Sequence, residues 1–168
     1  MNLRVLSDKD APFMLEWMHD TSVVENLQAN FATKTLEDCK QFILSAQDTS
    51  ENVHLAIVDD ADTYMGTVSL KHICDRRAEF AITIRTCAMG QGYARFAMAE
   101  IIRLGFEKLF LDTVYWCVAP ENKRAVRFYD KNGYPRVSLG ELECALRFYR
   151  PEQAKNYIWY AVNRDHSD

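Results

Sequence analysis

The sequence predicts an α/β (α+β) fold built on one mixed sheet of about seven strands, and three observations indicate it. Apolar residues mark three consecutive short segments between residues 53 and 84, as expected of an antiparallel meander. The period then becomes helical over 93–108 and returns to that of a strand over 111–118, which predicts a parallel β-α-β unit. No repeat, low-complexity tract or interdomain linker is visible, so we expect 1–168 to form one domain.

Each element has a local signal. Helices are expected where apolar residues recur every three or four positions, over 8–19, 35–47, 93–108 and 121–131. The second begins at Thr35, which forms a capping-box pattern with Asp38, and the last ends at Asn132-Gly133, a pair typical of a left-handed cap. Strands are expected over 3–6, 53–58, 64–71, 78–84, 111–118, 135–147 and 156–162. The last two would pair across a polar turn at 150–153.

The composition is that of an ordinary globular protein and excludes several classes. The chain has 168 residues, 48% of them hydrophobic, with 20 Lys and Arg against 24 Asp and Glu. No run approaches the roughly 18 apolar residues of a membrane span. A net charge of −4 without a basic block argues against nucleic-acid binding. This charge fits a cationic or neutral small molecule better. The start lacks the pattern of a secretory signal, so we expect a cytoplasmic protein.

The cysteines argue against metal and disulfide chemistry. They are odd in number and widely spaced, without a C-x-x-C pair, at Cys39, Cys74, Cys87, Cys117 and Cys144. We therefore expect no metal and mostly buried thiols. Cys117 could suggest a cysteine nucleophile, but no Cys-His pairing can be read, and a buried apolar thiol is the simpler interpretation.

The sharpest local signal is a glycine pair between a predicted strand and a predicted helix. Gly90 and Gly92 stand in the segment M-G-Q-G-Y-A. Glycines let the backbone turn with its N–H groups inward, and a helix N-terminus adds about half a positive charge, so this loop could hold a pyrophosphate. It lacks the Gly-Lys-Ser/Thr ending of triphosphate loops and the third glycine of the dinucleotide fingerprint. A turn that serves the backbone alone stays an alternative.

A second polar segment should lie at the same edge of the sheet. The sequence P-E-N-K-R-A-V-R-F-Y directly follows the strand over 111–118, so its helix would begin beside the glycine loop. Asn122 could act only as a helix cap, and Tyr129 only as a core aromatic, because Ala125 and Val126 share its helical face. Both segments could equally face one ligand.

Together these two segments, separated by a helix and a strand, resemble the GNAT superfamily of acetyl-coenzyme A-dependent N-acetyltransferases. The closest similarity is to the subgroup of ribosomal-protein N-terminal and spermidine acetyltransferases, and the element order is similar over nearly the whole chain. The resemblance implies helices on both faces of the sheet, acetyl-CoA as co-substrate and direct transfer to a primary amine. The acceptor could be a protein N-terminus, a polyamine, an amino sugar on a nucleotide or an antibiotic amine. Many relatives form dimers, so a homodimer is one expectation.

The resemblance also implies the cofactor contacts. The pyrophosphate would bind backbone N–H groups of the glycine loop. The pantetheine would run beside the strand over 80–84, where an N–H near Ile82 or Thr83 would stabilise the oxyanion. Cys87 and Met89 stand where the family usually has polar or basic residues. The residues implied at the cofactor are Ile82, Thr83, Ile84, Cys87, Ala88, Met89, Gly90, Gln91, Gly92, Tyr93, Ala94, Asn122, Ala125 and Phe128.

Two residues are the catalytic candidates. The resemblance places Tyr129 near the thioester sulfur, where its phenol would donate a proton to the leaving thiolate. The attacking alkyl ammonium has an ordinary pKa of about 10.4, so it must lose a proton. Glu79 resembles a glutamate that some relatives use to accept this proton directly or through water, and a solvated strand-end carboxylate is the alternative. His54 and His72 also have suitable ordinary pKa values, but a lone histidine on a strand is more often structural.

The acceptor pocket has the weakest signal. By resemblance, the first two helices with their linker, the hairpin near 72–77 and the last strands enclose it, which nominates Trp17, Asn26, Phe31, Tyr115 and Trp159. Each could instead be a packing residue. Aromatic rings can hold a cationic amine or stack on a sugar or a base. Two other functions stay open, namely a non-catalytic acyl-CoA-binding or interaction domain and nucleotide binding through the glycine loop.

Overall fold

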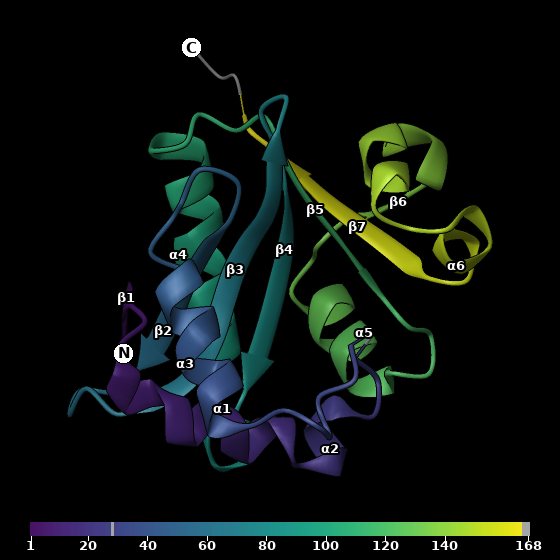
Figure 1. Cartoon of the computed structure of the whole chain (residues 1–168). Helices are drawn as coiled ribbons and strands as arrows, with labels where there is room; N and C mark the ends of the chain where they lie inside the picture. Colours follow the sequence, from purple (N-terminus) through teal and green to yellow (C-terminus); the bar gives the residue numbers. More distant parts are fainter. Residues whose placement is uncertain (28, 166–168) are drawn as a thin grey trace.

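The computed structural model describes residues 1–27 and 29–165. Its centre is one sheet in the order β1-β2-β3-β4-β5-β7-β6 (Figure 1). The strands are β1 (Asn2–Val5), β2 (Val53–Val58), β3 (Tyr64–Cys74), β4 (Arg77–Ile84), β5 (Thr113–Val118), β6 (Arg136–Val137) and β7 (Ile158–Asn163). Only β4 and β5 are parallel, and the other neighbouring pairs are antiparallel. The predicted seven-stranded mixed sheet is confirmed.

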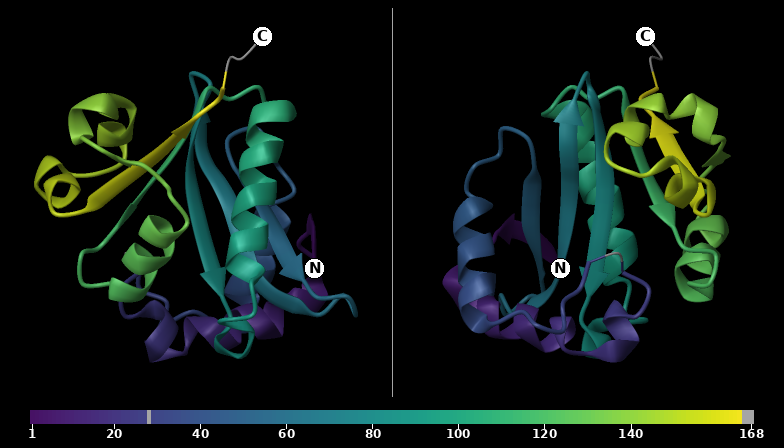
Figure 2. Two further views of the ribbon diagram at one scale, coloured as in Figure 1. Left: turned by 180° about the vertical axis from the view of Figure 1, so that it is seen from behind. Right: turned by 45° about the vertical axis from the view of Figure 1, so that its right-hand side comes forward.

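Helices cover both faces of this sheet. They are α1 (Ala11–Met18), α2 (Thr21–Val24), α3 (Leu36–Ser45), α4 (Tyr93–Glu107), α5 (Lys123–Lys131) and α6 (Pro151–Lys155). Figure 2 shows α4 on the side opposite to α1 and α3. The short 3₁₀ helices are η1 (Asp8–Asp10), η2 (Thr86–Ala88), η3 (Leu139–Glu141) and η4 (Glu143–Arg147). The predicted helix over 8–19 is thus η1 followed by α1.

The main core lies between α4 and the sheet. Ala97, Met98 and Ile101 of α4 are fully buried against the sheet, where Val68 and Leu70 are equally buried. Burying one such aliphatic side chain stabilises the fold by about 1.5–3 kcal/mol. A second core joins α1 and α3 to β2 and β3, and a third lies under the C-terminal segment. These cores make the central strands a rigid base for whatever binds at their ends.

The two parallel strands pair only at their beginnings. The register joins Arg77–Glu79 to Thr113–Tyr115, and it does not extend to Ile84. The strands then separate, as Figure 1 shows, while β4 stays paired with β3 as far as Ile84. From Phe80 onward, β4 therefore has an edge that β5 does not cover, at the end where α4 and α5 begin.

The predicted strand over 135–147 is wrong. Only Arg136–Val137 forms a strand, and η3 and η4 follow. The reason is local, because Ser138 begins a capping box in which both its N–H and its hydroxyl donate to Glu141. This turns the backbone away from the sheet just after Val137. The polar turn predicted at 150–153 is likewise the start of α6.

Two smaller expectations also fail. The polar linker after α1 contains the helix α2, whose first turn is capped by Asp20 accepting from the N–H of Ser22 at 3.0 Å. The cysteines are not mostly buried, since Cys39 is buried whereas Cys74 and Cys87 are exposed and the other two are half-buried. No helix in the described ranges is long and apolar enough to cross a membrane.

Candidate active site

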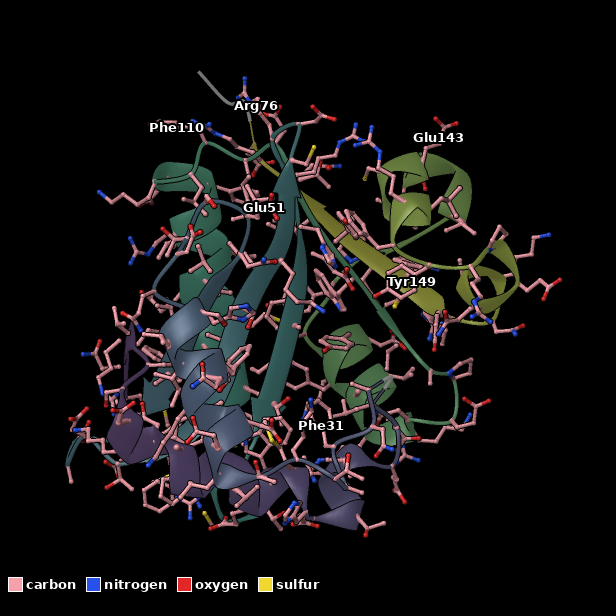
Figure 3. All side chains as sticks on the ribbon, viewed as in Figure 1. Phe31, Glu51, Arg76, Phe110, Glu143 and Tyr149 are labelled. Carbon is pink, nitrogen blue, oxygen red and sulfur yellow. The ribbon has the colours of Figure 1, made fainter. Side chains whose placement is uncertain are left out.

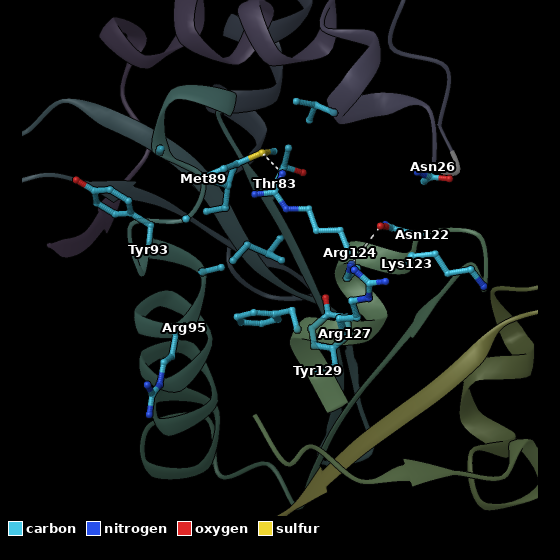
Figure 4. Close-up of a pocket in the computed structure, with 18 of the residues that line it drawn as sticks. Asn26, Thr83, Met89, Tyr93, Arg95, Asn122, Lys123, Arg124, Arg127 and Tyr129 are labelled. Atoms are coloured by element: carbon cyan, nitrogen blue, oxygen red, sulfur yellow. Dashed lines mark hydrogen bonds between the residues drawn. The ribbon is translucent and has the colours of Figure 1, made fainter. Parts of the chain in front are cut away.

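A cleft of about 1020 Å³ opens where β4 and β5 separate (Figure 4). Its walls come from the end of β4, the loop over 88–92, the first turn of α4, α5 and α2. The two segments singled out in the sequence therefore face one space from opposite walls. A glycine turn with only a structural role would not need to face the same space as the segment that follows β5.

The glycine loop has the backbone that its sequence predicts. Gly90 and Gly92 have φ values of 77° and 88°, in the left-handed region where a side chain is strained. Gly92 is the N-cap of α4, so the N–H groups of the first helical turn lack partners within the helix and open toward the cleft. The positive end of the helix dipole favours an anion here.

Most of the predicted cofactor residues line this cleft. Those that do are Ile82, Thr83, Ile84, Ala88, Met89, Gly90, Gly92, Tyr93, Ala94, Asn122, Ala125 and Phe128. Cys87 and Gln91 are outside the lining, and the amide of Gln91 donates to the carbonyl of Cys87 at 2.7 Å. This hydrogen bond from a side chain to the backbone closes the loop. Asn122 is both a helix cap, accepting from the N–H of Ala125 at 3.2 Å, and a lining residue.

The cleft is strongly basic, which the sequence reasoning missed. Its cations are Arg95 of α4 and Lys123, Arg124, Arg127 and Lys131 of α5, and no Asp or Glu is among its described lining residues. The signal was present in the sequence, because residues 123, 127 and 131 are four positions apart and share one helical face. This charge suits a ligand carrying several phosphates.

One of these cations reaches the glycine loop. The Arg124 guanidinium lies 2.6 Å from the sulfur of Met89, a contact drawn in Figure 4. Met89 occupies the position where a basic residue was expected from the resemblance. A positive charge is therefore present beside the loop, but α5 supplies it.

Tyr129 lies in the wall of the cleft and is 7% exposed. Its ring packs against Trp116 and Tyr160, with centroids 5.3 Å and 5.1 Å away. Burial raises the pKa of its phenol above the ordinary value, because the charged phenolate would be poorly solvated. The hydroxyl therefore stays protonated at neutral pH and can donate a proton.

Glu79 does not line the cleft. It is 4% exposed, so the alternative of a solvated strand-end carboxylate does not describe it. The hydroxyl of Tyr149 donates to Oε1, and Nε2 of His72 lies 3.7 Å from Oε2. Oε2 has no hydrogen-bond partner among the atoms described. Figure 3 shows Tyr149 beside β7, so the C-terminal segment covers this carboxylate.

Both candidate histidines are held uncharged by burial. Burial lowers the pKa of His54 to about 4, and its Nδ1 lies 2.6 Å from the hydroxyl of Ser69. Burial also lowers the pKa of His72, although the neighbouring Glu79 opposes this effect. The His72 ring stacks on Phe148 with centroids 3.8 Å apart.

The five acceptor candidates fall into three places. Trp17 and Phe31 line a second cavity of about 350 Å³, between the sheet and helices α1 and α3. Asn26 lines the basic cleft instead, opposite Asn122 in Figure 4. Tyr115 and Trp159 are 1% and 3% exposed in the C-terminal core and line neither cavity.

The N-terminal helices are tied to the loop beneath the cleft. The hydroxyl of Thr86 donates to Asp20 at 2.6 Å, which fixes the start of α2 beside η2. Arg85 donates to both oxygens of Glu16 at 3.0 Å. These contacts keep α2, and with it Asn26, over the mouth of the cleft.

Comparison with known proteins identifies the family. The model of the acetyltransferase (GNAT) domain matches residues 1–135. Acetyltransferase PseH of Campylobacter jejuni is 22% identical over 134 residues, covering 79% of this chain and 82% of that protein. Spermidine N(1)-acetyltransferase of Vibrio cholerae is 36% identical over 81 residues, covering 46% of this chain and 47% of that protein.

Solved structures show the same fold. The spermidine N-acetyltransferase of Vibrio cholerae in complex with CoA and spermine has a TM-score of 0.78 at 20% identity, covering 96% of this chain and 94% of that one. A putative ribosomal-protein-serine acetyltransferase of Vibrio cholerae has a TM-score of 0.71 at 17% identity, covering 96% and 92%. The matched family region contains the glycine loop, the basic helix and Tyr129. The chain therefore belongs to the acetyltransferase (GNAT) domain family, whose acyl donor is acetyl-CoA.

Proposed function

We propose that the protein transfers the acetyl group of acetyl-CoA to a primary amine, by direct attack on the thioester in a ternary complex. The observation that carries this proposal is the convergence of the glycine loop, the basic face of α5 and Tyr129 on one cleft beside the uncovered edge of β4. The lining of the cleft combines basic residues with apolar residues such as Ile82 and Phe128, which suits a long ligand with polar and apolar parts. Acetyl-CoA has that character, with phosphates at one end and a thioester at the other.

The residues that would hold the donor are specified by their chemistry. The diphosphate would accept hydrogen bonds from backbone N–H groups of the glycine loop and the first turn of α4. Arg124 and the neighbouring cations of α5 would neutralise the phosphates. The pantetheine amides would pair with the uncovered edge of β4, as an added strand pairs with a sheet.

The reaction then needs three groups. The amine nitrogen attacks the thioester carbon, and a backbone N–H near Ile82 or Thr83 stabilises the negative oxygen that forms. The carbon–sulfur bond breaks, and Tyr129 gives its proton to the departing thiolate. The proton that the amine must lose would travel along a chain of waters to Glu79, which lies on the same strand at roughly 13 Å from Thr83, at about 3.3 Å per residue. The products are an acetamide and free coenzyme A.

The acceptor class and the assembly are parts of this proposal. The names of the Vibrio cholerae relatives support including polyamines among the amines to be tested. One neighbouring structure is described as a dodecameric spermidine N-acetyltransferase, which supports a homo-oligomer for this chain. Light scattering after gel filtration would measure the mass directly, and a monomer would contradict this part. Of the acceptor candidates, Trp17 and Phe31 are the two that the proposal keeps.

The proposal is tested in two steps. Thermal unfolding is first measured with coenzyme A, acetyl-CoA and a nucleoside triphosphate, and then free-thiol release is measured across a panel of primary amines. We expect both forms of coenzyme A to raise the Tm and at least one amine to release thiol. Stabilisation without thiol release from any amine would indicate a non-catalytic acyl-CoA-binding domain. Stabilisation by the triphosphate alone would indicate nucleotide binding.

A further inference from the structure

The second cavity meets the basic cleft at β4. Ile82 and Thr83 belong to the lining of both spaces. This is the part of β4 where the proposed reaction places the thioester. An amine bound in the second cavity would therefore approach the thioester from the face of the sheet that α1 and α3 cover.

The walls of this cavity are flat and apolar. Trp17 and Phe31 meet edge to face, with centroids 5.1 Å apart, and Phe42 lines the same space. Trp17 is held in place because its indole N–H donates to the hydroxyl of Tyr64 at 3.0 Å. A rigid aromatic wall of this kind favours a ligand with a ring or another flat apolar body.

The charge around the cavity is positive. Lys34 and Lys71 line it, and neither takes part in an ion pair among the described residues. Asp38 is the one acidic residue of the described lining, and its Oδ2 accepts from both the N–H and the hydroxyl of Thr35, at 2.8 Å and 3.0 Å, so the two lysines outnumber the one carboxylate. His54 is uncharged at neutral pH.

Glu79 does not reverse this balance. It stands opposite Lys71 in the β3–β4 register, so the two residues are cross-strand neighbours on this face. Its two oxygens, however, face Tyr149 of the C-terminal segment and His72 of β3. The distance along β4 from Thr83 to Glu79 is roughly 13 Å at about 3.3 Å per residue. Lys71 is therefore placed to meet the far end of an acceptor whose amine lies at Thr83.

We infer that the second cavity is the acceptor site and that its acceptor is a primary amine on a flat, apolar body that carries an anionic group, such as a carboxylate or a phosphate. This inference rests on the proposed acetyl transfer and names its substrate class. A polyamine fits less well, because its second ammonium would lie beside Lys34 and Lys71, with Asp38 as the one carboxylate of the described lining.

Three matched amines test the inference. They are 4-(aminomethyl)benzoate, 4-(aminomethyl)benzamide and 1,4-bis(aminomethyl)benzene, which share the ring and the reacting amine and differ in the charge of the far substituent. We expect kcat/KM for thiol release to fall in that order, by at least tenfold from the first to the last, which is about 1.4 kcal/mol. Spermidine is expected to react no faster than the bis-amine.

Two lysine variants assign the effect to the cavity. Lys71→Gln should reduce the ratio between the benzoate and the bis-amine severalfold, whereas Lys40→Gln, at an exposed position of α3 outside both cavities, should leave it unchanged. The inference is overturned if the bis-amine or spermidine is the best acceptor, or if Lys71→Gln leaves the ratio unchanged.

A binding measurement separates this inference from the proposed function. Calorimetry with the coenzyme A-bound protein should give the same order of affinity for the three amines. If no amine releases thiol, the proposed acetyl transfer fails, and the calorimetric order still decides whether the cavity prefers an anionic ligand. If thiol is released in the opposite order, acetyl transfer stands and the assigned substrate class is wrong.

Discussion

Replacing Tyr129 with phenylalanine removes one hydroxyl from the wall of the cleft and leaves the packing of the ring unchanged. The ring contacts with Trp116 and Tyr160 involve only carbon faces and edges, and no described hydrogen bond uses the Tyr129 hydroxyl. The Tm and the Kd for coenzyme A should therefore change little. If the hydroxyl is the proton donor to the thiolate, kcat should fall by about 10²- to 10⁴-fold. This corresponds to about 2.7–5.4 kcal/mol of lost transition-state stabilisation.

The pH dependence of this loss follows from the environment of the phenol. Because burial raises the pKa of Tyr129 above its ordinary value near 10, the protonated form is fully present below that pH. The ratio of the wild-type rate to the Tyr129→Phe rate should therefore be constant between pH 6.5 and 9. If the wild-type rate declined on the alkaline side within this range, the decline would have to come from the titration of another group.

The assay is single-turnover thiol release with the protein in excess over acetyl-CoA and the fastest amine of the panel at saturation. Tyr134→Phe is the matched control, since this ring lies 6.4 Å from that of Tyr129 in the same aromatic cluster and lines neither cavity. We expect its rate to remain close to that of the wild type. The reasoning is refuted if Tyr129→Phe keeps the wild-type rate while chemistry is rate-limiting, or if Tyr134→Phe loses as much.

Three further substitutions have specific expected outcomes. Gly92→Ala should lower the free energy of unfolding by about 1–2 kcal/mol, because the left-handed φ of residue 92 disfavours a side chain. The same variant should bind coenzyme A more weakly in calorimetry. Gly133→Ala, also at a left-handed φ but outside the cleft, should lower only the Tm. Glu79→Gln should raise the pH of half-maximal rate, because the amine must then deprotonate in solution, and an unaltered pH profile would remove Glu79 as the base. Arg124→Gln should raise the Kd for coenzyme A about three- to tenfold at low salt. Arg103→Gln, on the exposed face of α4, should leave this Kd unchanged. Equal effects of the two substitutions would show that Arg124 does not contact a phosphate.

The sheet was predictable because its strands carry strong local patterns. Three consecutive apolar segments before residue 84 and one helical period after it fix the meander and the crossover, and the structure has both. The C-terminal segment gave a wrong strand because apolar residues such as Leu142 and Ala145 resemble strand residues in sequence. In the structure both side chains are buried, but Leu142 lies between the 3₁₀ helices η3 and η4 and Ala145 lies in η4. Their periodicity does not distinguish these two geometries over so short a length.

The position of Tyr129 could be predicted from the sequence, whereas the surroundings of Glu79 could not. Tyr129 follows from a helix that begins at the end of β5, so its place in the cleft needs no long-range contact. The surroundings of Glu79 depend on Tyr149, which is 70 residues away, just after the segment where the predicted strand failed. Burial of a carboxylate by a distant chain segment has no local signal, so the sequence could not reveal it.

The distribution of charge explains how the cleft tolerates an apolar glycine loop. Cys87 and Met89 give the loop no cation, yet three basic residues spaced four apart on α5 line the same cleft, and Arg124 contacts Met89 directly. The backbone N–H groups of the loop would orient the phosphates of the ligand, and the side chains of α5 would neutralise their charge. Because these two contributions come from different elements, substitutions in α5 should weaken phosphate binding without disturbing the loop. Substitutions at the glycines should disturb both the loop and the helix that begins there.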